Sequence, residues 1–277
     1  MPELPEVELV ARSLDRLLRG RSVVAARLLR PGLAPDTSPR SFALRLRGVS
    51  FESAARRGKH VLLHLGGAHV LVTHLRMTGR FLLLPAEREL PPHTHAVFLL
   101  DDERRLVFTD QRHFGFMKLV RADELDGAKE LRALAPEPFA EDFTPDYLRR
   151  TLSRTRRALK EVLLDQTKVT GLGNIYAAEV LFLARVNPFL AAAELSPRRV
   201  PRLHRAIQDV LAESIAHGST MNVDPENIDG SYYGGAYEGR WRVYDREGEP
   251  CLACGARVRR VSRAGRSTYF CPRCQKR

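Results

Sequence analysis

The chain has 277 residues, of which 44% are hydrophobic and 28% are charged. This composition excludes wholesale disorder, and the length predicts about two folded domains. Lysine and arginine number 45 against 33 aspartates and glutamates, which gives a formal net charge of +12. The positive excess favours a polyanionic partner, either nucleic acid or an anionic membrane surface, over a basic protein without a special partner.

Neither membrane insertion nor export is predicted for any segment. The most apolar tract, 61–72, is interrupted by histidines and glycines, so it is too short and too polar to span a bilayer. The first residues are Met-Pro-Glu, without the basic and apolar stretches of a secretory signal. We therefore expect a cytoplasmic protein with no membrane partner.

The first half of the chain begins with one helix and continues as strands. Apolar residues at helical spacing predict a helix over 7–18, which Gly20 would end. Gly66-Gly67 and the polar residues 101–103 would form turns between strands. Short runs rich in Val, Leu and Phe predict the strands 22–29, 42–46, 61–65, 70–74, 81–84, 96–100 and 105–108. This number of short strands indicates an antiparallel sandwich or barrel.

The second half is predicted to be helical. Thr144-Pro145 has the pattern of an N-cap followed by a first-turn proline, and further helices are predicted at 158–163, 175–185 and 196–217. We expect a domain over 1–130, a linker over 131–143, a helical domain over 144–239 and a metal-binding segment over 240–277. The stretch 219–239, rich in Gly, Tyr, Asn and Asp, is expected to be a long exposed loop.

All four cysteines lie near the C-terminus, as two C-x-x-C pairs separated by sixteen residues: Cys251, Cys254, Cys271 and Cys274. Four thiolates complete a tetrahedral Zn²⁺ site, so the simplest prediction is one structural zinc ion. An iron–sulfur cluster or redox-active thiols are the alternatives. A catalytic zinc is disfavoured because four protein ligands leave no open coordination position.

Two basic segments are typical of contacts with a nucleic-acid backbone. From residue 240 to the end the chain carries eleven basic and three acidic residues, and five of the arginines lie between the cysteine pairs. The turn Gly171-Leu172-Gly173-Asn174 would direct backbone N–H groups toward an anion at a helix N-terminus. It follows a stretch rich in basic residues, 149–160, so the two together are expected to clamp a duplex.

The N-terminus suggests chemistry beyond binding. Methionine before a small residue such as proline is commonly removed, which would leave the secondary amine of Pro2 free. An amine that attacks the masked aldehyde of a sugar forms an iminium ion, and Glu3 is placed to move protons. An exposed, unreactive chain end remains the alternative on these residues alone.

Four segments carry a resemblance to a known family: PELPEVE at the N-terminus, DQRHFG, TGLGNIYAAEVLF, and GRSTYFCPRCQK after the first C-x-x-C. In this order and over the whole chain they resemble the formamidopyrimidine-DNA glycosylases of the Fpg/Nei family. The resemblance implies an α+β fold with an N-terminal antiparallel β-sandwich and flanking helices, then a helix–two-turn–helix domain ending in a four-cysteine zinc finger. It implies a bifunctional DNA-formamidopyrimidine glycosylase and apurinic/apyrimidinic (AP) lyase that excises 8-oxoguanine and formamidopyrimidines from double-stranded DNA.

The resemblance also assigns roles to residues. Pro2 would be the nucleophile, Glu3 the general acid/base, Lys59 the lysine that assists β-elimination, and Arg266 the arginine of δ-elimination. Glu6 and Glu179 would lie near the lesion pocket. The DNA contacts would be made by His74, Met77, His93, Arg112, Phe114, Arg156, Lys160 and Asn174, of which Met77, Arg112 and Phe114 would fill the gap left by the extruded base.

The sequence departs from the family pattern in two places. Gln111 stands where the family usually has proline and His113 where it often has a second arginine. The loop 219–239, which in the family closes over the extruded base, has an unusual sequence here. Two alternatives therefore stay open: a glycosylase for oxidised pyrimidines of the endonuclease VIII type, and a non-catalytic binder of nucleic acid. A monomer is expected, because one chain carries both basic segments and the N-terminal nucleophile.

Overall fold

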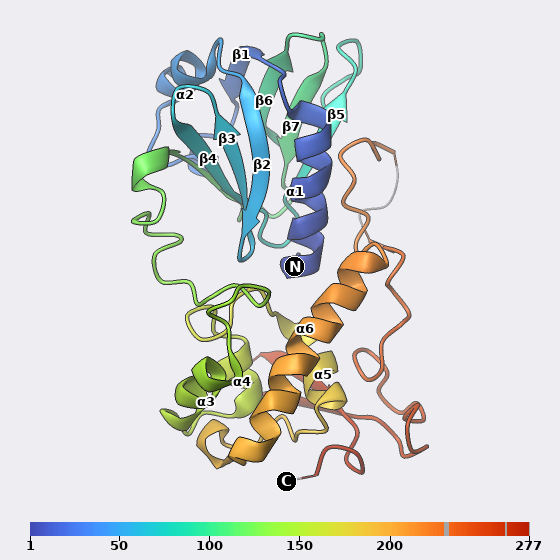
Figure 1. Cartoon of the computed structure of the whole chain (residues 1–277). Coiled ribbons are helices and arrows are strands. Elements are labelled where there is room, and N and C mark those ends of the chain that lie inside the picture. The colour runs from blue at the N-terminus through green and yellow to red at the C-terminus, as the bar shows by residue number, and fades with distance from the viewer. Residues whose placement is uncertain (230–232, 264, 277) are drawn as a thin grey trace. The chain divides into compact units, whose positions relative to one another are not determined.

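The structure is a computed structural model that describes residues 1–229, 233–263 and 265–276. Its contacts divide the chain into two units, shown together in Figure 1. The first unit consists of Met1–Arg132 and Gly218–Ala236, and the second of Ala133–His217 and Tyr237–Arg277. In the described part of the chain, no helix has the length and apolar character needed to cross a membrane.

The first unit is a sandwich of two four-stranded antiparallel sheets. One sheet has the order β1 (Val23–Leu28), β6 (Thr94–Leu100), β7 (Arg105–Thr109) and β5 (Arg80–Leu84). The other has the order β2 (Phe51–Arg57), β3 (His60–Leu65), β4 (His69–His74) and β8 (Phe116–Arg121). Buried residues of both sheets belong to one apolar core. The predicted antiparallel sandwich is therefore confirmed, with turns at 66–68 and 101–104 as expected.

Helix α1 (Leu4–Leu18) packs against β2 and begins at a capping box (Figure 1). The Glu3 backbone N–H donates to Glu6 Oε2 at 2.8 Å, and the Glu3 side chain accepts from the Glu6 backbone in return. This reciprocal pair satisfies two N–H groups that the first turn of a helix leaves unpaired. The helix buries Val7, Val10 and Leu14, so the start of the chain is fixed on the sandwich.

Two differences from the sequence prediction concern the sandwich. The expected strand 42–46 is wrong: it is the helix α2 (Pro39–Leu46). Ser38 caps the helix by accepting from the Ser41 N–H at 3.2 Å, and Phe42 and Leu46 are buried one helical turn apart. The strands β2 and β8 were not predicted. Short 3₁₀ turns occur at η1 (Pro31–Leu33) and η2 (Ala122–Glu124).

The second unit contains the predicted helices and a hairpin. Its helices are α3 (Pro145–Ser153), α4 (Leu159–Leu163), α5 (Asn174–Leu183) and α6 (Val200–Ala216), with 3₁₀ turns η3 (Ala192–Glu194) and η4 (Pro197–Arg199). Helices α5 and α6 pack together, and their buried contact includes a hydrogen bond of 2.6 Å between Tyr176 Oη and Ser214 Oγ. Strands β9 (Arg259–Arg263) and β10 (Arg266–Phe270) form an antiparallel hairpin between the two cysteine pairs.

The stretch 218–236 packs with the first unit, whereas the sequence prediction placed 219–239 with the helical domain. Met221 and Val223 are part of the sandwich core, and the Leu83 N–H donates to the Pro225 carbonyl at 2.9 Å. The burial of Met221 and Val223 and the hydrogen bond to the edge strand β5 therefore hold this stretch on the sandwich. Residues 230–232 of the predicted loop lie outside the described residues.

Candidate functional site

Pro2, Glu3 and Lys59 are buried in the first unit, whereas Met1 is 39% exposed. Pro2 and Glu3 directly precede α1, and the Glu3 side chain is 2% exposed. Lys59, 5% exposed, lies in the tight turn between β2 and β3, next to Gly58, whose positive φ of 57° is the conformation that glycine adopts most easily. The β2–β3 hairpin thus places Lys59 close to the N-terminal residues.

The pKa of the terminal amine, which in this structure is that of Met1, is lowered. Burial is the main cause, and the positive charges of Lys59 and Arg112 act in the same direction. The carboxylates of Glu3 and Glu6 oppose the shift. All four side chains are therefore close enough to the terminus to act on it electrostatically. A lowered pKa enlarges the neutral fraction of an amine at neutral pH, and only the neutral amine is a nucleophile.

Glu6 connects this terminus to the stretch 218–236. Its Oε2 accepts from the Glu3 N–H, while its Oε1 accepts from Thr220 N at 3.1 Å and Thr220 Oγ1 at 2.8 Å. The side chain is 1% exposed, so these bonds replace its hydration. Glu6 thus lies beside Glu3, near the site where the resemblance placed it.

Glu179 has a different environment, in the second unit. Its fully buried carboxylate accepts from the backbone N–H groups of Arg242, Val243 and Tyr244 at 2.8–2.9 Å. Burial raises its pKa, while these three bonds act against the shift. The contacts show a carboxylate that anchors the chain leading into the zinc finger.

His74 ends β4 in a nearly closed environment. Burial and the neighbouring His60 lower the pKa of His74 to about 2, and burial lowers that of His60 to about 4. The two rings meet edge to face with centroids 4.7 Å apart. His74 Nδ1 accepts from the Arg76 N–H at 3.0 Å, so a neutral His74 carries its proton on Nε2. His74 therefore offers a neutral N–H donor, consistent with its predicted phosphate contact.

Two loops of the first unit, carrying Met77 on one and Arg112 and Phe114 on the other, are joined through Asp110. The Asp110 carboxylate accepts from Thr78 Oγ1, from Gly115 N at 2.7 Å and from Arg112 N at 3.2 Å. These hydrogen bonds lower the pKa of Asp110 against the effect of burial. Thr78 Oγ1 also accepts from Arg112 N at 3.0 Å. The structure thus brings the predicted gap-filling residues onto adjacent loops.

Most of the side chains proposed to contact DNA near these two loops are exposed to solvent. Arg112 and Phe114 are exposed, with the guanidinium carbon 5.0 Å from the Phe114 ring centroid. Met77 is half-buried and His93 is exposed. Asp110 and Thr78 were not singled out from the sequence. The available signal was an aspartate before a glycine-containing turn, where its side chain commonly bonds to backbone N–H groups.

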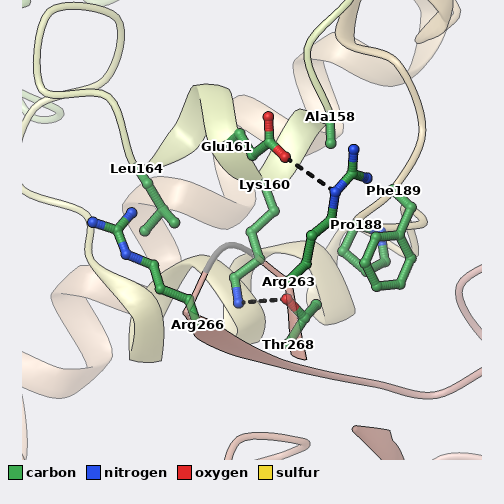
Figure 2. Close-up of a pocket in the computed structure, with 9 residues that line it drawn as sticks. All are labelled: Ala158, Lys160, Glu161, Leu164, Pro188, Phe189, Arg263, Arg266 and Thr268. Carbon is green, nitrogen blue, oxygen red and sulfur yellow. Dashed lines mark hydrogen bonds and ion pairs between the residues drawn. The ribbon is translucent and has the colours of Figure 1, made fainter. Parts of the chain in front are cut away.

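Cationic residues predicted to contact DNA also lie in the second unit. Figure 2 shows the Lys160 ammonium directed at Thr268 beside a cavity of about 70 Å³ that Arg263 and Arg266 also line. Lys160 Nζ donates to Ser267 O at 2.8 Å and Thr268 Oγ1 at 3.0 Å. Lys160 is 5% exposed, so in this structure it supports the hairpin that presents the exposed Arg266. Arg156 is exposed.

Asn174 is the first residue of α5, as expected from the glycine turn before it. Gly171 has a φ of 88°, a conformation that strains other residues, and Gly173 occupies the N-cap position. The buried Oδ1 of Asn174 has no hydrogen-bond partner among the described residues. Anions are favoured at a helix N-terminus through backbone N–H groups, whereas the amide oxygen of Asn174 is itself an acceptor and could take only a donor.

The four cysteines gather into one cluster in which their Sγ atoms lie within 4.8 Å of one another. The pairs Cys251–Cys274 and Cys254–Cys271 are 3.9 and 3.5 Å apart. Zinc–sulfur bonds of about 2.3 Å place tetrahedral ligands about 3.8 Å apart, so the cluster fits one structural Zn²⁺. The prediction of a four-cysteine zinc finger is confirmed.

Comparison with known proteins gives three family matches in chain order. Residues 1–117 match the formamidopyrimidine-DNA glycosylase N-terminal domain, 134–224 its H2TH (helix–two-turn–helix) domain, and 248–277 a zinc finger found in FPG and IleRS. These matches cover the sandwich, the helices and the cysteine cluster described above.

Individual relatives match over their full lengths. The formamidopyrimidine-DNA glycosylase of Heliobacterium modesticaldum is 44% identical over all of both chains, and that of Bacillus subtilis is 40% identical over 99% of both. A crystal structure of Lactococcus lactis Fpg with DNA containing an abasic site is 31% identical, with a TM-score of 0.91 over 99% of this chain and 100% of that one. The same L. lactis protein with Fapy-dG-containing DNA also has a TM-score of 0.91. The chain therefore belongs to the formamidopyrimidine-DNA glycosylase family.

Proposed function

We propose that Pro2 is the nucleophile with which this DNA glycosylase and AP lyase excises oxidised purines from duplex DNA. The observation that carries the assignment is the environment of the chain start: Pro2, Glu3 and Lys59 are buried, and burial lowers the pKa of the amine of Met1, the residue before Pro2. Removal of Met1 would transfer the nucleophile to the secondary amine of Pro2. A secondary amine forms an iminium ion without needing a second proton loss from nitrogen.

The first step breaks the glycosidic bond. The Pro2 nitrogen lone pair attacks C1′ of the damaged nucleotide, and the electron pair of the C1′–N bond leaves with the base, which takes up a proton. Glu3 protonates the ring oxygen O4′ as the C1′–O4′ bond opens, and the Pro2 nitrogen loses its proton. The product is an iminium ion between Pro2 and C1′, and no oxidant or reductant is needed.

The iminium then allows strand cleavage. Loss of a C2′ proton expels the 3′ phosphate (β-elimination), and loss of a C4′ proton expels the 5′ phosphate (δ-elimination). Lys59 is proposed to assist the first elimination, and Arg266 the second. Water releases the sugar fragment and restores the amine of Pro2.

The remaining residues are proposed to hold the DNA. His74, His93, Arg156, Lys160 and Asn174 would contact phosphates, and Met77, Arg112 and Phe114 would occupy the gap left by the extruded base. Their supporting features are the neutral N–H of His74, the exposed Arg112–Phe114 pair and the position of Asn174 at the N-terminus of α5. The cysteines would hold zinc for folding and DNA binding, outside the chemical steps. We propose a monomer, since one chain supplies every group named here.

Borohydride trapping tests the proposal. Reduction of the iminium should give a covalent protein–DNA adduct with an 8-oxoguanine duplex, attached at Pro2 of the Met1-processed protein. Pro2→Gly should strongly reduce strand cleavage. A protein carrying residues before Pro2 serves as the matched control, because it keeps the DNA-binding surfaces and lacks the free amine. Absence of any adduct with correctly processed protein would leave a non-catalytic DNA binder as the explanation.

One observation supports a second substrate class. L. lactis Fpg, 32% identical to this chain, has been crystallised with DNA containing an oxidised pyrimidine. A single excision assay with 8-oxoguanine and thymine glycol duplexes in competition would separate the candidates. We expect the purine lesion to be removed first, and preferential removal of thymine glycol would place the chain with the pyrimidine-specific enzymes.

A further inference from the structure

One arginine of the first unit, Arg56, connects helix α1 to the turn that carries Lys59. Its side chain is 8% exposed. Its Nε donates to Glu8 Oε2 of α1 at 2.9 Å, and its Nη1 donates to the Gly58 carbonyl at 3.1 Å. We infer that Arg56 is a positioning residue for strand cleavage, which acts by holding Lys59 in place. The inference rests on the role proposed above for Lys59.

The carbonyl that Arg56 contacts belongs to the peptide group that joins Gly58 to Lys59. The last residue pair of the β2–β3 hairpin is Arg57 with His60, so Gly58 and Lys59 form a two-residue turn. The two common types of such a turn differ mainly by a flip of this central peptide group. Gly58 has a φ of 57°, and glycine resists a flip less than other residues because it has no Cβ. A hydrogen bond to this carbonyl therefore selects one orientation of the backbone at Lys59.

The burial of Lys59 makes the orientation of its backbone important. The residue is 5% exposed, so neighbouring atoms restrict its flexible side chain, and the backbone direction determines where its ammonium lies. Its charge acts on the amine of Met1, which places it near the chain start. A displacement of about 1 Å in a reacting group can lower a rate by about 10²-fold. Holding the turn is therefore expected to matter for the elimination that Lys59 assists.

Glu8 fixes the other end of the Arg56 guanidinium on a helix. Burial acts to raise the pKa of Glu8, but the hydrogen bonds and charges of Arg56 and Arg12 outweigh it and lower the pKa, so Glu8 is ionised at neutral pH. An ionised acceptor strengthens the bond from the guanidinium. Helix α1 begins directly after the proposed nucleophile and its neighbouring glutamate. One guanidinium thus joins this helix to the turn that carries Lys59.

Strand cleavage of a duplex with a preformed abasic site tests the inference, because this substrate enters the reaction after base excision. In single turnover, Arg56→Gln should slow β-elimination about tenfold, while affinity for a duplex with a tetrahydrofuran abasic analogue (the abasic-analogue duplex) changes less than about threefold. Arg56→Lys keeps a cation for Glu8 but lacks the planar fork that reaches two acceptors, so it should melt close to wild type and still cleave slowly. Arg12→Gln is the matched control and should cleave as wild type, since Arg12, 62% exposed, donates to the other oxygen of Glu8 at 2.8 Å.

A double-mutant cycle shows whether Arg56 acts through Lys59. Lys59→Gln should slow β-elimination by itself, and adding Arg56→Gln to it should slow the step no further, because the positioned group is then absent. A double variant whose loss equals the product of the two single losses would overturn the inference. So would an Arg56→Gln variant that cleaves as fast as wild type, or an Arg56→Lys variant that restores the wild-type rate.

Borohydride trapping of the same proteins separates this inference from the proposed function. Formation of the adduct needs the amine of Pro2 and precedes elimination, so Arg56→Gln should trap as wild type does. Absence of an adduct with wild type would refute the proposed nucleophile. An adduct with wild type but none with Arg56→Gln would show that Arg56 acts on the chain start, and would refute its action through Lys59 alone.

Discussion

Glu3 and Glu6 are neighbouring buried carboxylates, and their hydrogen bonds indicate different roles. Both oxygens of Glu6 already accept backbone or hydroxyl donors from Glu3 and Thr220, so Glu6 is a structural acceptor. Glu3 accepts from the Glu6 backbone within the capping box and adjoins the reactive chain terminus. Of the two, Glu3 is the carboxylate suited to proton transfer.

Glu3→Gln tests this difference. The amide keeps an oxygen for the capping box and loses the transferable proton, so excision of 8-oxoguanine should fall by about 10² to 10⁴-fold. Affinity for the abasic-analogue duplex should change by less than about threefold. Single-turnover excision and equilibrium binding on the same protein measure the two effects. A parallel loss of both would show that Glu3 acts through structure instead of proton transfer.

The buried pair His60 and His74 predicts how stability depends on pH. Their pKa values in the folded protein are lowered to about 4 and about 2, whereas an unfolded histidine titrates near 6.5. Below pH 6.5 the unfolded state therefore binds more protons, and folding stability falls as the pH is lowered. Each histidine contributes up to about 1.4 kcal/mol per pH unit in this range.

Thermal unfolding at pH 7.5 and pH 5 measures this effect. The melting temperature should drop on acidification, and His74→Gln should show a smaller drop than wild type. His64→Gln, at a half-buried position of β3, is the matched control for a histidine-to-glutamine change in the same sheet. A His74→Gln protein as acid-sensitive as wild type would contradict the assignment.

At the scale of elements, the loop that follows β7 depends on one carboxylate. Asp110 gathers the hydroxyl of Thr78 and the N–H groups of Arg112 and Gly115, and so ties the Met77 loop to the Arg112–Phe114 turn. Gly115 is required there as well, because an added Cβ would lie 2.9 Å from the Phe108 ring. The loops that carry the side chains proposed to fill the gap are thus held by the buried Asp110 carboxylate.

Asp110→Asn should loosen this turn. An amide has one acceptor oxygen in place of two, so either the Gly115 N–H or the Thr78 hydroxyl would lose its acceptor, at a cost of about 1–3 kcal/mol. We expect faster hydrogen exchange in 111–115 and weaker binding of the abasic-analogue duplex, with the zinc finger unaffected. Asp126→Asn, on the surface of the same unit, is the control. Unchanged exchange in the Asp110 variant would show that the turn is held by other contacts.

The features that depend only on neighbouring residues could be predicted from the sequence. The C-x-x-C pairs, the Thr144-Pro145 helix start and the glycine turn before Asn174 were read directly from residue type and spacing. Phe42 and Leu46 misled the prediction, because a short apolar run fits a strand or a helix until the Ser38 cap is considered. Strand β2 was missed because its exposed and half-buried positions carry charged and small residues, FESAARR.

The contacts that organise the site could not be predicted from local patterns. Thr78 and Asp110 are 32 residues apart, and Glu6 and Thr220 are 214 residues apart. Such bonds follow from the tertiary fold, which also determines that 218–236 packs with the sandwich. The motifs indicated the type of chemistry, whereas the tertiary packing of the sandwich determines which of these side chains lie close together.

For the whole molecule, part of the positive charge in the second unit is already paired. Arg149 and Arg150 share Asp146, and Arg157 pairs with Asp165 at 2.8 Å. Exposed pairs of this kind add little to stability and are exchanged easily for a phosphate. A net charge of +12 gives the chain long-range attraction to DNA. Specific placement depends on cations held by the fold, such as Lys160, which is bonded to Ser267 and Thr268.

Metal removal tests how the two units depend on zinc. The segment 251–274 has few buried apolar residues, and these share one small cluster with Ala178 and Phe182 of α5, so folding of the segment is expected to depend on the ion. Chelation, or Cys271→Ser, should disorder the β9–β10 hairpin that carries Arg266 and weaken duplex binding by a factor of ten or more. Ser262→Ala, exposed on β9, is the control variant.

The sandwich should survive the same treatment, because its core consists of residues of the first unit. Hydrogen exchange followed by mass spectrometry distinguishes the two regions: protection should be lost in 251–274 and retained in β3, β4 and β6. Zinc added back to the chelated wild type should restore both hairpin protection and binding, and should restore neither in Cys271→Ser. Retained hairpin protection after verified zinc loss would show that the apolar cluster suffices, and that the metal serves neither folding nor the presentation of Arg266.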